Sequence, residues 1–124
     1  KRGAALAARF ADEFNVAFRT DEVTEDAFDR IRAAARETGR KVALSIARTC
    51  CVARDEAGLR VRADAIGRDV TELRDLQIGG TPNEVVDRIG RFAELGASRV
   101  YLQMNDLDDL DQLELIAAEV LPQV

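Results

Sequence analysis

Three residues at the start of the sequence have the types and the spacing of an anion-binding site. Lys1, Arg2 and Gly3 lead directly into residues 4–11, which have the composition of a helix. Free N–H groups at a helix N-terminus, together with two cationic side chains, can hold a phosphate group. Exposed basic termini are also common in proteins, so these residues alone leave both interpretations open.

Two further polar residues lie in short apolar segments with the pattern of strands. Asn15 falls within residues 14–18, where bulky side chains alternate, and Gln103 ends residues 100–103. In a parallel α/β sheet, ligands bind beyond the carboxyl ends of the strands. Each side chain could therefore hydrogen-bond a ligand, or it could satisfy a neighbouring backbone group, and the sequence does not favour one alternative.

Two other motifs are better explained as helix starts than as ligand sites. The acidic residues within 106–111 lack the Gly and the ligand spacing of a calcium loop, so we expect Asp106 to cap a helix instead. Residues 79–82 lack the Lys-Ser/Thr pair of a nucleotide loop. We expect a loop there, followed by Thr81 as the N-cap of a helix. These motifs predict no metal site.

Composition narrows the classes of function. A length of 124 residues predicts a single domain, 1–124. The net charge of −5 argues against nucleic-acid binding, and the apolar runs are too short to cross a membrane. The sequence contains no His, which excludes Ser-His and Cys-His nucleophile schemes within it. The length, charge and composition leave a small organic substrate open.

The adjacent residues Cys50 and Cys51 bear on the cellular compartment. A disulfide between sequence neighbours would be strained, and two thiols without a nearby His make a poor metal site. We expect a pair of reduced thiols on a strand. With no secretion leader in the sequence, this indicates a reducing compartment, which we expect to be the cytoplasm.

The predicted elements alternate between helices and strands. Helices are expected over residues 4–11, 20–39, 55–67, 81–96 and 106–122, a shorter helical turn over 70–73, and strands over 14–18, 42–47 and 100–103. In the second strand the small residues Ala43, Ser45 and Ala47 share one face. The inward face of the last helix is predicted to carry Leu107, Leu110, Leu113, Ile116, Ala117 and Val120. Such alternation predicts right-handed crossovers and a parallel sheet.

Three stretches of the chain resemble a known family. The segments AARFADEFNV, GTPNEVVDRIGRFAELGASRVYLQ and LDDLDQLELIAAEVLP are similar to the C-terminal part of luciferase-like oxidoreductases, in the branch that depends on the deazaflavin coenzyme F420. The resemblance implies a TIM (β/α)₈ barrel, which needs about 250 residues. It places residues 14–16, 42–47 and 100–103 as strands six, seven and eight. This chain would then supply about three β/α units of such a barrel.

The resemblance also implies an activity. Members of the family transfer hydride between a reduced deazaflavin and an organic substrate, or carry out flavin-dependent monooxygenation with FMN. By match of position, Lys1, Arg2 and Gly3 would lie near the cofactor phosphate, Asn15 near the ring and Gln103 near the substrate. The backbone bulge under the ring lies on an earlier strand, so we expect the chain alone to be inactive. No catalytic residue is predicted.

A partial barrel is expected to need a partner. Three parallel strands cannot close an eight-stranded barrel, and we expect an isolated piece to expose an apolar inner face and two unpaired edges. The partner would be the remainder of the barrel or a second copy, which makes a homo-oligomer. The alternative left open is a non-catalytic α/β module that dimerises.

Overall fold

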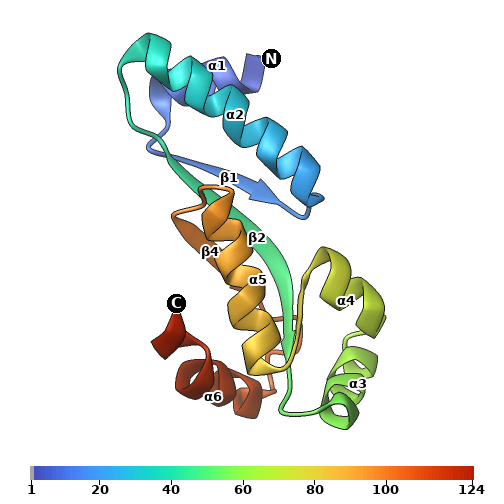
Figure 1. Ribbon diagram of the computed structural model, residues 1–124. Coiled ribbons are helices and arrows are strands. Elements are labelled where there is room, and N and C mark those ends of the chain that lie inside the picture. The colour runs from blue at the N-terminus through green and yellow to red at the C-terminus, as the bar shows by residue number, and fades with distance from the viewer. Residues whose placement is uncertain (1) are drawn as a thin grey trace. The chain divides into compact units, whose positions relative to one another are not determined.

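The computed structural model describes residues 2–124, and Lys1 lies outside them (Figure 1). The helices are α1 (Arg2–Phe10), α2 (Asp21–Thr38), α3 (Glu56–Ala65), α4 (Val70–Leu76), α5 (Pro82–Glu94) and α6 (Leu110–Glu119), followed by the 3₁₀ helix η1 (Leu121–Gln123). The strands are β1 (Glu13–Ala17), β2 (Ala43–Val52), β3 (Ile78–Gly80) and β4 (Arg99–Gln103). The predicted α/β alternation is confirmed. None of the helices in this part of the chain is long and apolar enough to cross a membrane.

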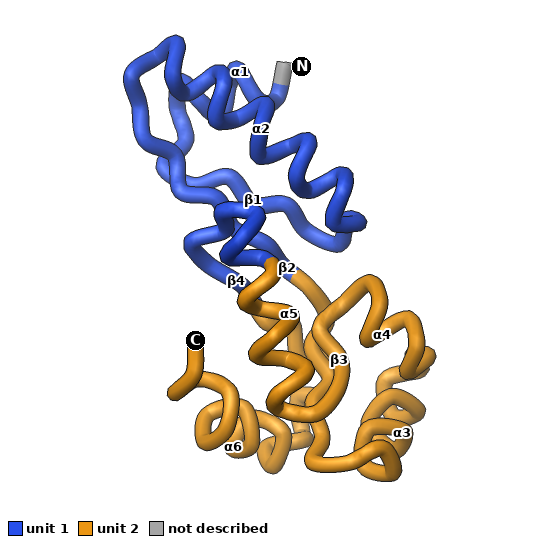
Figure 2. Tube along the Cα trace, in the orientation of Figure 1, with its two compact units in different colours: residues 1–47, 92–101 blue, residues 48–91, 102–124 orange. Residues whose placement is uncertain are grey.

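The chain divides into two compact units, shown in Figure 2. Unit 1 comprises residues 1–47 and 92–101, and unit 2 comprises residues 48–91 and 102–124. Strand β2 contributes its first half to unit 1 and its second half to unit 2. Each unit therefore contains a segment of the same central strand.

Unit 1 is built on the parallel pair β1 and β2. Their register runs from Glu13 opposite Ala43 to Ala17 opposite Ala47. Helix α2 begins at the N-cap Thr20 and ends at Gly39, which adopts a φ of 68° that glycine tolerates best, as the sequence predicted. The helix covers the apolar face of the pair, where buried residues gather, among them Val16, Phe28, Ile31, Leu44 and Ile46.

Unit 2 contains a strand that the sequence did not predict. Residues 78–80 form β3, which pairs in parallel with β2 through Cys50 opposite Ile78 and Val52 opposite Gly80. The loop expected at the two glycines was therefore wrong. A side chain at Gly79 would place its Cβ 2.6 Å from the Cβ of Leu73, so glycine is needed there because α4 lies close to the strand.

Strand β2 extends further than the sequence predicted and includes both cysteines. Cys50 and Cys51 are free thiols, and both are buried. Burial raises the pKa of the Cys50 thiol to about 12, so that it carries no charge near neutral pH. The expected pair of reduced thiols on a strand is confirmed. Cys51 packs in a core cluster with Ala53, Leu59, Ala63 and Leu73.

The last helix starts later than predicted. Asp109, not Asp106, is the N-cap of α6, because its Oδ1 accepts a hydrogen bond of 3.0 Å from the Gln112 N–H. Asp106 instead accepts from the Asp108 N–H in the preceding turn, at 3.1 Å. The later start changes which side of the helix faces the core.

The predicted inward face of α6 was correct in part. Ile116 and Val120 are buried, as expected. Leu107, Leu110, Leu113 and Ala117 are exposed instead. Gln112 and Leu115 are buried in their place. The reason is that Asp109 pairs with Arg62 of α3 and Gln112 accepts a hydrogen bond from Val52 of β2, which turns this side of α6 inward.

Candidate functional site

The face of the β1–β2 pair that lies away from α2 is polar. Side chains alternate along a strand, and the register places Asn15 opposite Ser45, on the same face as Glu13 and Ala43. Leu44, on the other face, lines a groove with residues of α2. We expected an apolar inner face on a partial barrel, and in unit 1 this expectation was wrong. Alternation puts the apolar residues of both strands under the helix.

The Glu13 carboxylate accepts hydrogen bonds from other polar side chains on this face. Glu13 accepts a hydrogen bond from the Tyr101 hydroxyl at 2.9 Å and another from the Arg99 guanidinium. Ser45 lies on the same face, two residues along β2 from the Ala43 that pairs with Glu13. The Ser45 hydrogen bond, followed by those from Tyr101 and Arg99, holds the pKa of Glu13 below its ordinary value. Glu13 is therefore an ionised acceptor near neutral pH.

Asn15 is joined to the same group of residues. Its Nδ2 donates to the Ser45 Oγ at 2.9 Å, and the residue is exposed. This hydrogen bond joins Asn15 to Ser45, and the bonds from Arg99 and Tyr101 reach Glu13 on the same face. We call this set the sheet-face relay; its members are Glu13, Asn15, Ser45, Arg99 and Tyr101.

The relay crosses the central strand. On one edge of β2, the Ala43 N–H donates to the backbone carbonyl of Asp12, just before β1. On the opposite edge, the Leu44 carbonyl accepts from the N–H of Ser98, just before β4. Side chains from β1 and β4 meet across β2 because the residue beside Glu13 is the small Ala43. The small residues predicted for one face of β2 therefore leave room for polar side chains from both neighbouring strands.

The remaining predicted site residues fall elsewhere or outside the described part. Gln103 is the exposed last residue of β4 and belongs to unit 2, where no relay member lies. Gly3 is in the first turn of α1, with nothing within 4 Å of a side chain placed there. Lys1 and the side chain of Arg2 lie outside what the structure describes. Of the predicted residues, only Asn15 joins the relay.

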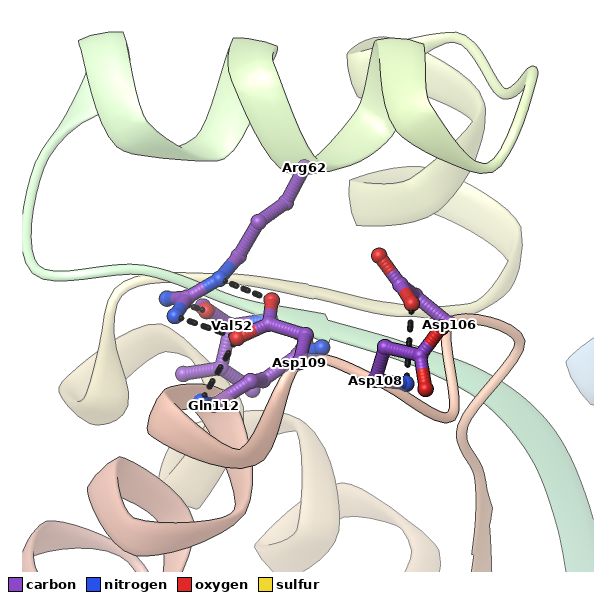
Figure 3. A network of polar contacts seen from close by, with 6 residues as sticks. All are labelled: Val52, Arg62, Asp106, Asp108, Asp109 and Gln112. Carbon is purple, nitrogen blue, oxygen red and sulfur yellow. Dashed lines mark hydrogen bonds and ion pairs between the residues drawn. The ribbon is translucent and has the colours of Figure 1, made fainter.

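Unit 2 holds a second polar network, at the carboxyl end of β2 (Figure 3). Arg62 of α3 donates from Nη1 to the Val52 carbonyl at 2.8 Å and from Nε and Nη2 to the two Asp109 oxygens at 2.6 and 3.0 Å. The Gln112 Oε1 accepts from the Val52 N–H at 2.7 Å. We call this set the strand-end clamp; its members are Val52, Arg62, Asp109 and Gln112.

The strand-end clamp is more enclosed than the relay. The side chains of Arg62 and Asp109 are 21% and 16% exposed, and Gln112 is 3% exposed. The hydrogen bond from Arg62 is the main cause that holds the pKa of Asp109 below its ordinary value. The N–H and the carbonyl of Val52 both form hydrogen bonds with side chains. The clamp therefore supplies the backbone hydrogen bonds that a neighbouring strand would otherwise make at the end of β2.

A groove of about 660 Å³ lies beside the clamp, between α3 and α6. Its charged lining residues are Arg54, Asp55, Arg62, Asp111 and Glu114. Both arginines are already paired, one with Glu119 and the other with Asp109. The uncompensated charge of the groove is therefore negative, which disfavours a phosphate group there. Among residues 2–124, no group of three or more His, Cys, Asp or Glu side chains could hold a metal ion.

Sequence reasoning missed four members of the relay: Glu13, Ser45, Arg99 and Tyr101. A signal was present, because polar residues alternate with apolar ones in both outer strands, as in Glu13-Phe14-Asn15-Val16 and Arg99-Val100-Tyr101-Leu102. This period of two predicts a polar face on each strand. The pattern does not show that the two faces meet.

Comparison with solved structures gives clear similarities of fold. An F420-dependent secondary alcohol dehydrogenase, solved with an F420–acetone adduct, matches with a TM-score of 0.76 at 17% identity over 99% of this chain and 46% of that chain. The coenzyme F420-dependent tetrahydromethanopterin reductase from Methanopyrus kandleri matches with a TM-score of 0.73 at 19% identity over 96% of this chain and 47% of that chain.

A flavin protein is similar to nearly the same extent. The oxygenating constituent of 3,6-diketocamphane monooxygenase from Pseudomonas putida, a type II Baeyer–Villiger enzyme solved with FMN, matches with a TM-score of 0.69 at 18% identity. The match covers 98% of this chain and 45% of that chain. No family model and no curated protein sequence matches the chain.

These similarities confirm the predicted fold. The chain has a partial TIM-barrel fold of the kind found in F420-dependent oxidoreductases and luciferase-like monooxygenases. It spans less than half the length of these three solved chains.

Proposed function

We propose that this chain forms strands six to eight of a β/α barrel that transfers hydride between coenzyme F420 and a small organic substrate. The observation that carries the proposal is the fold, because almost the whole chain matches two F420-dependent oxidoreductases. The polar sheet face of unit 1 supports it, since ligand sites of β/α barrels lie toward the carboxyl ends of the strands and use a small number of polar groups.

The predicted cofactor contacts are distributed along the chain in this proposal. The start of α1, with Lys1, Arg2 and Gly3, would hold the cofactor phosphate. In support, α1 has no acidic residue in its first turn, whereas each of the helices α2 to α6 has at least one. The negative groove of unit 2 makes the usual phosphate position of such barrels, after strands seven and eight, unfavourable here.

Two polar side chains would contact the ring and the substrate. The exposed Asn15 amide fits a heterocyclic ring that carries hydrogen-bonding groups, and Gln103 would bind the substrate. A deazaflavin supplies the hydride chemistry itself when bound, so the protein's task is to bind, orient and exclude water. The absence of His from the sequence is compatible with this division of labour.

The second candidate is an FMN-dependent monooxygenase. The similarity to a monooxygenase solved with FMN favours it, at nearly the same TM-score. FMN has a flavin ring and coenzyme F420 a deazaflavin ring, and nothing in unit 1 separates the two. Binding measurements with both cofactors are therefore needed.

The apolar surface of the chain fits a partner in either case. Leu110 and Leu113 of α6 are 61% and 47% exposed, and Leu6 and Phe10 of α1 are 58% and 71% exposed. The members of each pair lie three or four residues apart on one face of their helix, and an exposed apolar patch can mark a contact with a partner. We propose that the remainder of the barrel covers them, and that the chain alone is inactive. A second copy in the same role would give the dimeric, non-catalytic module instead.

The test is a titration of the complete gene product that contains this chain with coenzyme F420 and with FMN, followed by a hydride-transfer assay with secondary alcohols. Binding of F420 with turnover supports the proposal, and binding of FMN with oxygen consumption supports the second candidate. If neither cofactor binds and sedimentation shows a dimer of 124-residue chains, the non-catalytic module is correct. The three outcomes are distinct.

A further inference from the structure

We propose that a basic groove in unit 1 binds a phosphate monoester whose organic part is apolar. The groove has a volume of about 480 Å³ and lies where the chain leaves α2 and enters β2 (Figure 1). We call it the helix-end groove; its lining residues come from within 31–44, in α2, the connection after it and the start of β2. The inference goes beyond the proposed function and does not rest on it, because it assigns a second ligand to a different part of the fold.

The charged residues that line the helix-end groove are all cations. They are Arg32 and Arg36, which are neighbours one turn apart on α2, and Arg40 and Lys41, which lie between α2 and β2. The whole chain carries a net charge of −5, so this concentration of positive charge runs against the composition of the protein. A cleft lined by charges of one sign attracts a ligand of the opposite sign, which here is an anion.

The four cations differ in whether they are paired. Arg32 and Arg40 each form an ion pair with an aspartate. Within residues 2–124, the structure shows no ion pair of the Arg36 and Lys41 side chains. Two uncompensated positive charges match a phosphate monoester, which carries a charge of about −1.5 to −2 near neutral pH. A carboxylate would leave one of the two cations unmatched.

The end of α2 does not need these cations to complete its hydrogen bonds. Cationic side chains near a helix C-terminus can bond to its last carbonyl groups. Here backbone N–H groups do so, because Gly39 donates to the Arg36 carbonyl at 3.4 Å and Arg40 donates to the Ala35 carbonyl at 3.2 Å. The Arg36 guanidinium and the Lys41 ammonium group are therefore available to a ligand.

The floor of the helix-end groove is apolar. Ile31 and Ala35 of α2 and Leu44 of β2 contribute to it and are buried, and Val42 is partly exposed. A Cβ placed at Gly39 would meet nothing within 4 Å, so the space beside the floor is open. Small-ligand sites are mostly apolar, with a few polar groups that fix the orientation of the ligand. An apolar organic group would cover the floor while its phosphate contacts the cations.

The helix-end groove differs from the proposed cofactor site in position and in chemistry. Leu44 lies on the face of the β1–β2 pair that α2 covers, opposite the sheet-face relay. Lys41 and Val42 precede β2, so the groove lies at the amino end of this strand, whereas β/α barrels act on substrates at the carboxyl ends. None of the described residues that line the groove is His, Cys, Ser, Thr, Asp or Glu. The groove is therefore suited to binding a ligand rather than to transforming one.

The experiment measures the binding of phenyl phosphate to the complete gene product that contains this chain, by isothermal titration calorimetry. Phenyl phosphate should bind at least about fivefold more tightly than inorganic phosphate, because its ring covers the apolar floor. It should also bind at least about threefold more tightly than benzoate, which has a single charge. Arg36→Ala and Lys41→Ala should each weaken the binding of phenyl phosphate by about tenfold, the loss expected for one charge-assisted hydrogen bond. Both residues are exposed, so the variants should fold.

The matched control is Arg30→Ala. Arg30 lies on the same helix and is exposed, but it pairs with Asp26 and does not line the helix-end groove. This variant removes the same charge and should keep its affinity for phenyl phosphate within about twofold, because exposed charges away from the ligand are screened. Equal losses in Arg36→Ala and Arg30→Ala would overturn the inference. So would an affinity for phenyl phosphate no higher than that for inorganic phosphate or benzoate, or no binding of phenyl phosphate at millimolar concentration.

The affinity for coenzyme F420 and for FMN separates the helix-end groove from the proposed cofactor site. Arg36→Ala and Lys41→Ala should leave this affinity unchanged. A parallel loss of affinity for the cofactor and for phenyl phosphate would make the groove part of the cofactor site, which overturns the inference and leaves the proposed function standing. If the wild type binds phenyl phosphate through Arg36 and Lys41 but binds neither cofactor, the inference stands and the proposed function fails.

Discussion

The sheet-face relay and the strand-end clamp contain similar side chains but differ in how exposed these side chains are. Both join an arginine and a carboxylate with one amide side chain. In the clamp the amide of Gln112 is 3% exposed and is engaged with the backbone of Val52. In the relay the amide of Asn15 is exposed and bonded on one side only. The difference predicts that the clamp stabilises the fold, whereas the relay contributes little to stability.

The physical reason is the cost of an unpaired group. A buried donor or acceptor that loses its partner costs about 1–3 kcal/mol, and exposed ion pairs contribute at most about 1 kcal/mol. Substitutions in the clamp should therefore reduce stability, and substitutions in the relay should affect binding with little effect on stability. The following predictions test this contrast.

The largest effect is expected from Arg62→Met. It leaves the largely buried Asp109 carboxylate without its bidentate partner and the Val52 carbonyl without its donor. The free energy of unfolding should fall by about 2–3 kcal/mol, measured by urea denaturation. Arg60→Met on the same helix removes an exposed pair with Glu56 and should cost less than about 0.5 kcal/mol. Equal losses in the two variants would contradict the assigned role of the clamp.

Thiol labelling of Cys50 should detect the loss of stability of Arg62→Met within unit 2. Cys50 lies two residues before Val52, is 1% exposed and has a pKa of about 12, so it should react with a disulfide reagent only when unit 2 opens. A loss of about 2 kcal/mol in Arg62→Met predicts labelling about thirtyfold faster than in the wild type. Fast labelling of the wild type near neutral pH would show that β2 is not closed in this way.

The clamp should also be sensitive to acid. Arg62 lowers the pKa of Asp109 in the folded state below the 3.8 of the unfolded chain. The contribution of this ion pair to the free energy of unfolding is therefore complete above about pH 4, and it is lost as the pH falls through the lower folded-state pKa. Asn can also serve as an N-cap, so Asp109→Asn mainly removes the charge. The stability difference between the wild type and Asp109→Asn, measured by urea denaturation from pH 7 to pH 2, should shrink with acid. A difference that stays constant would rule out this ion pair as its source.

The smallest effect on stability is expected from Tyr101→Phe in the relay. Tyr101 is 48% exposed, so losing its hydroxyl should change the free energy of unfolding by less than about 0.5 kcal/mol. The pKa of Glu13 should rise toward its ordinary value, because one of the hydrogen bonds that lower it is gone. NMR titration of the Glu13 carboxyl measures this directly. A loss above about 2 kcal/mol would make the relay a structural element like the clamp.

Local sequence signals predicted most of the elements. Thr20 and Gly39 bound α2 as expected, and Glu84 accepts from the Thr81 N–H at 2.7 Å, as the predicted capping box requires. These features depend on residues a few positions apart. Two of the failures, β3 and the start of α6, have tertiary causes: the close approach of Leu73 to Gly79, and the pairing of Asp109 with Arg62.

The site was harder to predict than the fold for the same reason. Asn15 was recognisable as a polar residue in an apolar strand, but its partner Ser45 lies 30 positions away. Tyr101 and Glu13 are separated by 88 positions. Their contact arises because β1 and β4 both pair with β2, which hydrophobic periodicity does not reveal.

One measurement addresses the central claim, that the sheet-face relay faces a redox cofactor. It is the affinity of the complete gene product for coenzyme F420, compared with that of its Asn15→Ala variant under the same conditions. We predict binding by the wild type, an affinity about tenfold lower in the variant, and equal unfolding free energies for the two. Equal affinities, or no binding of coenzyme F420 or FMN by the wild type, would contradict the account.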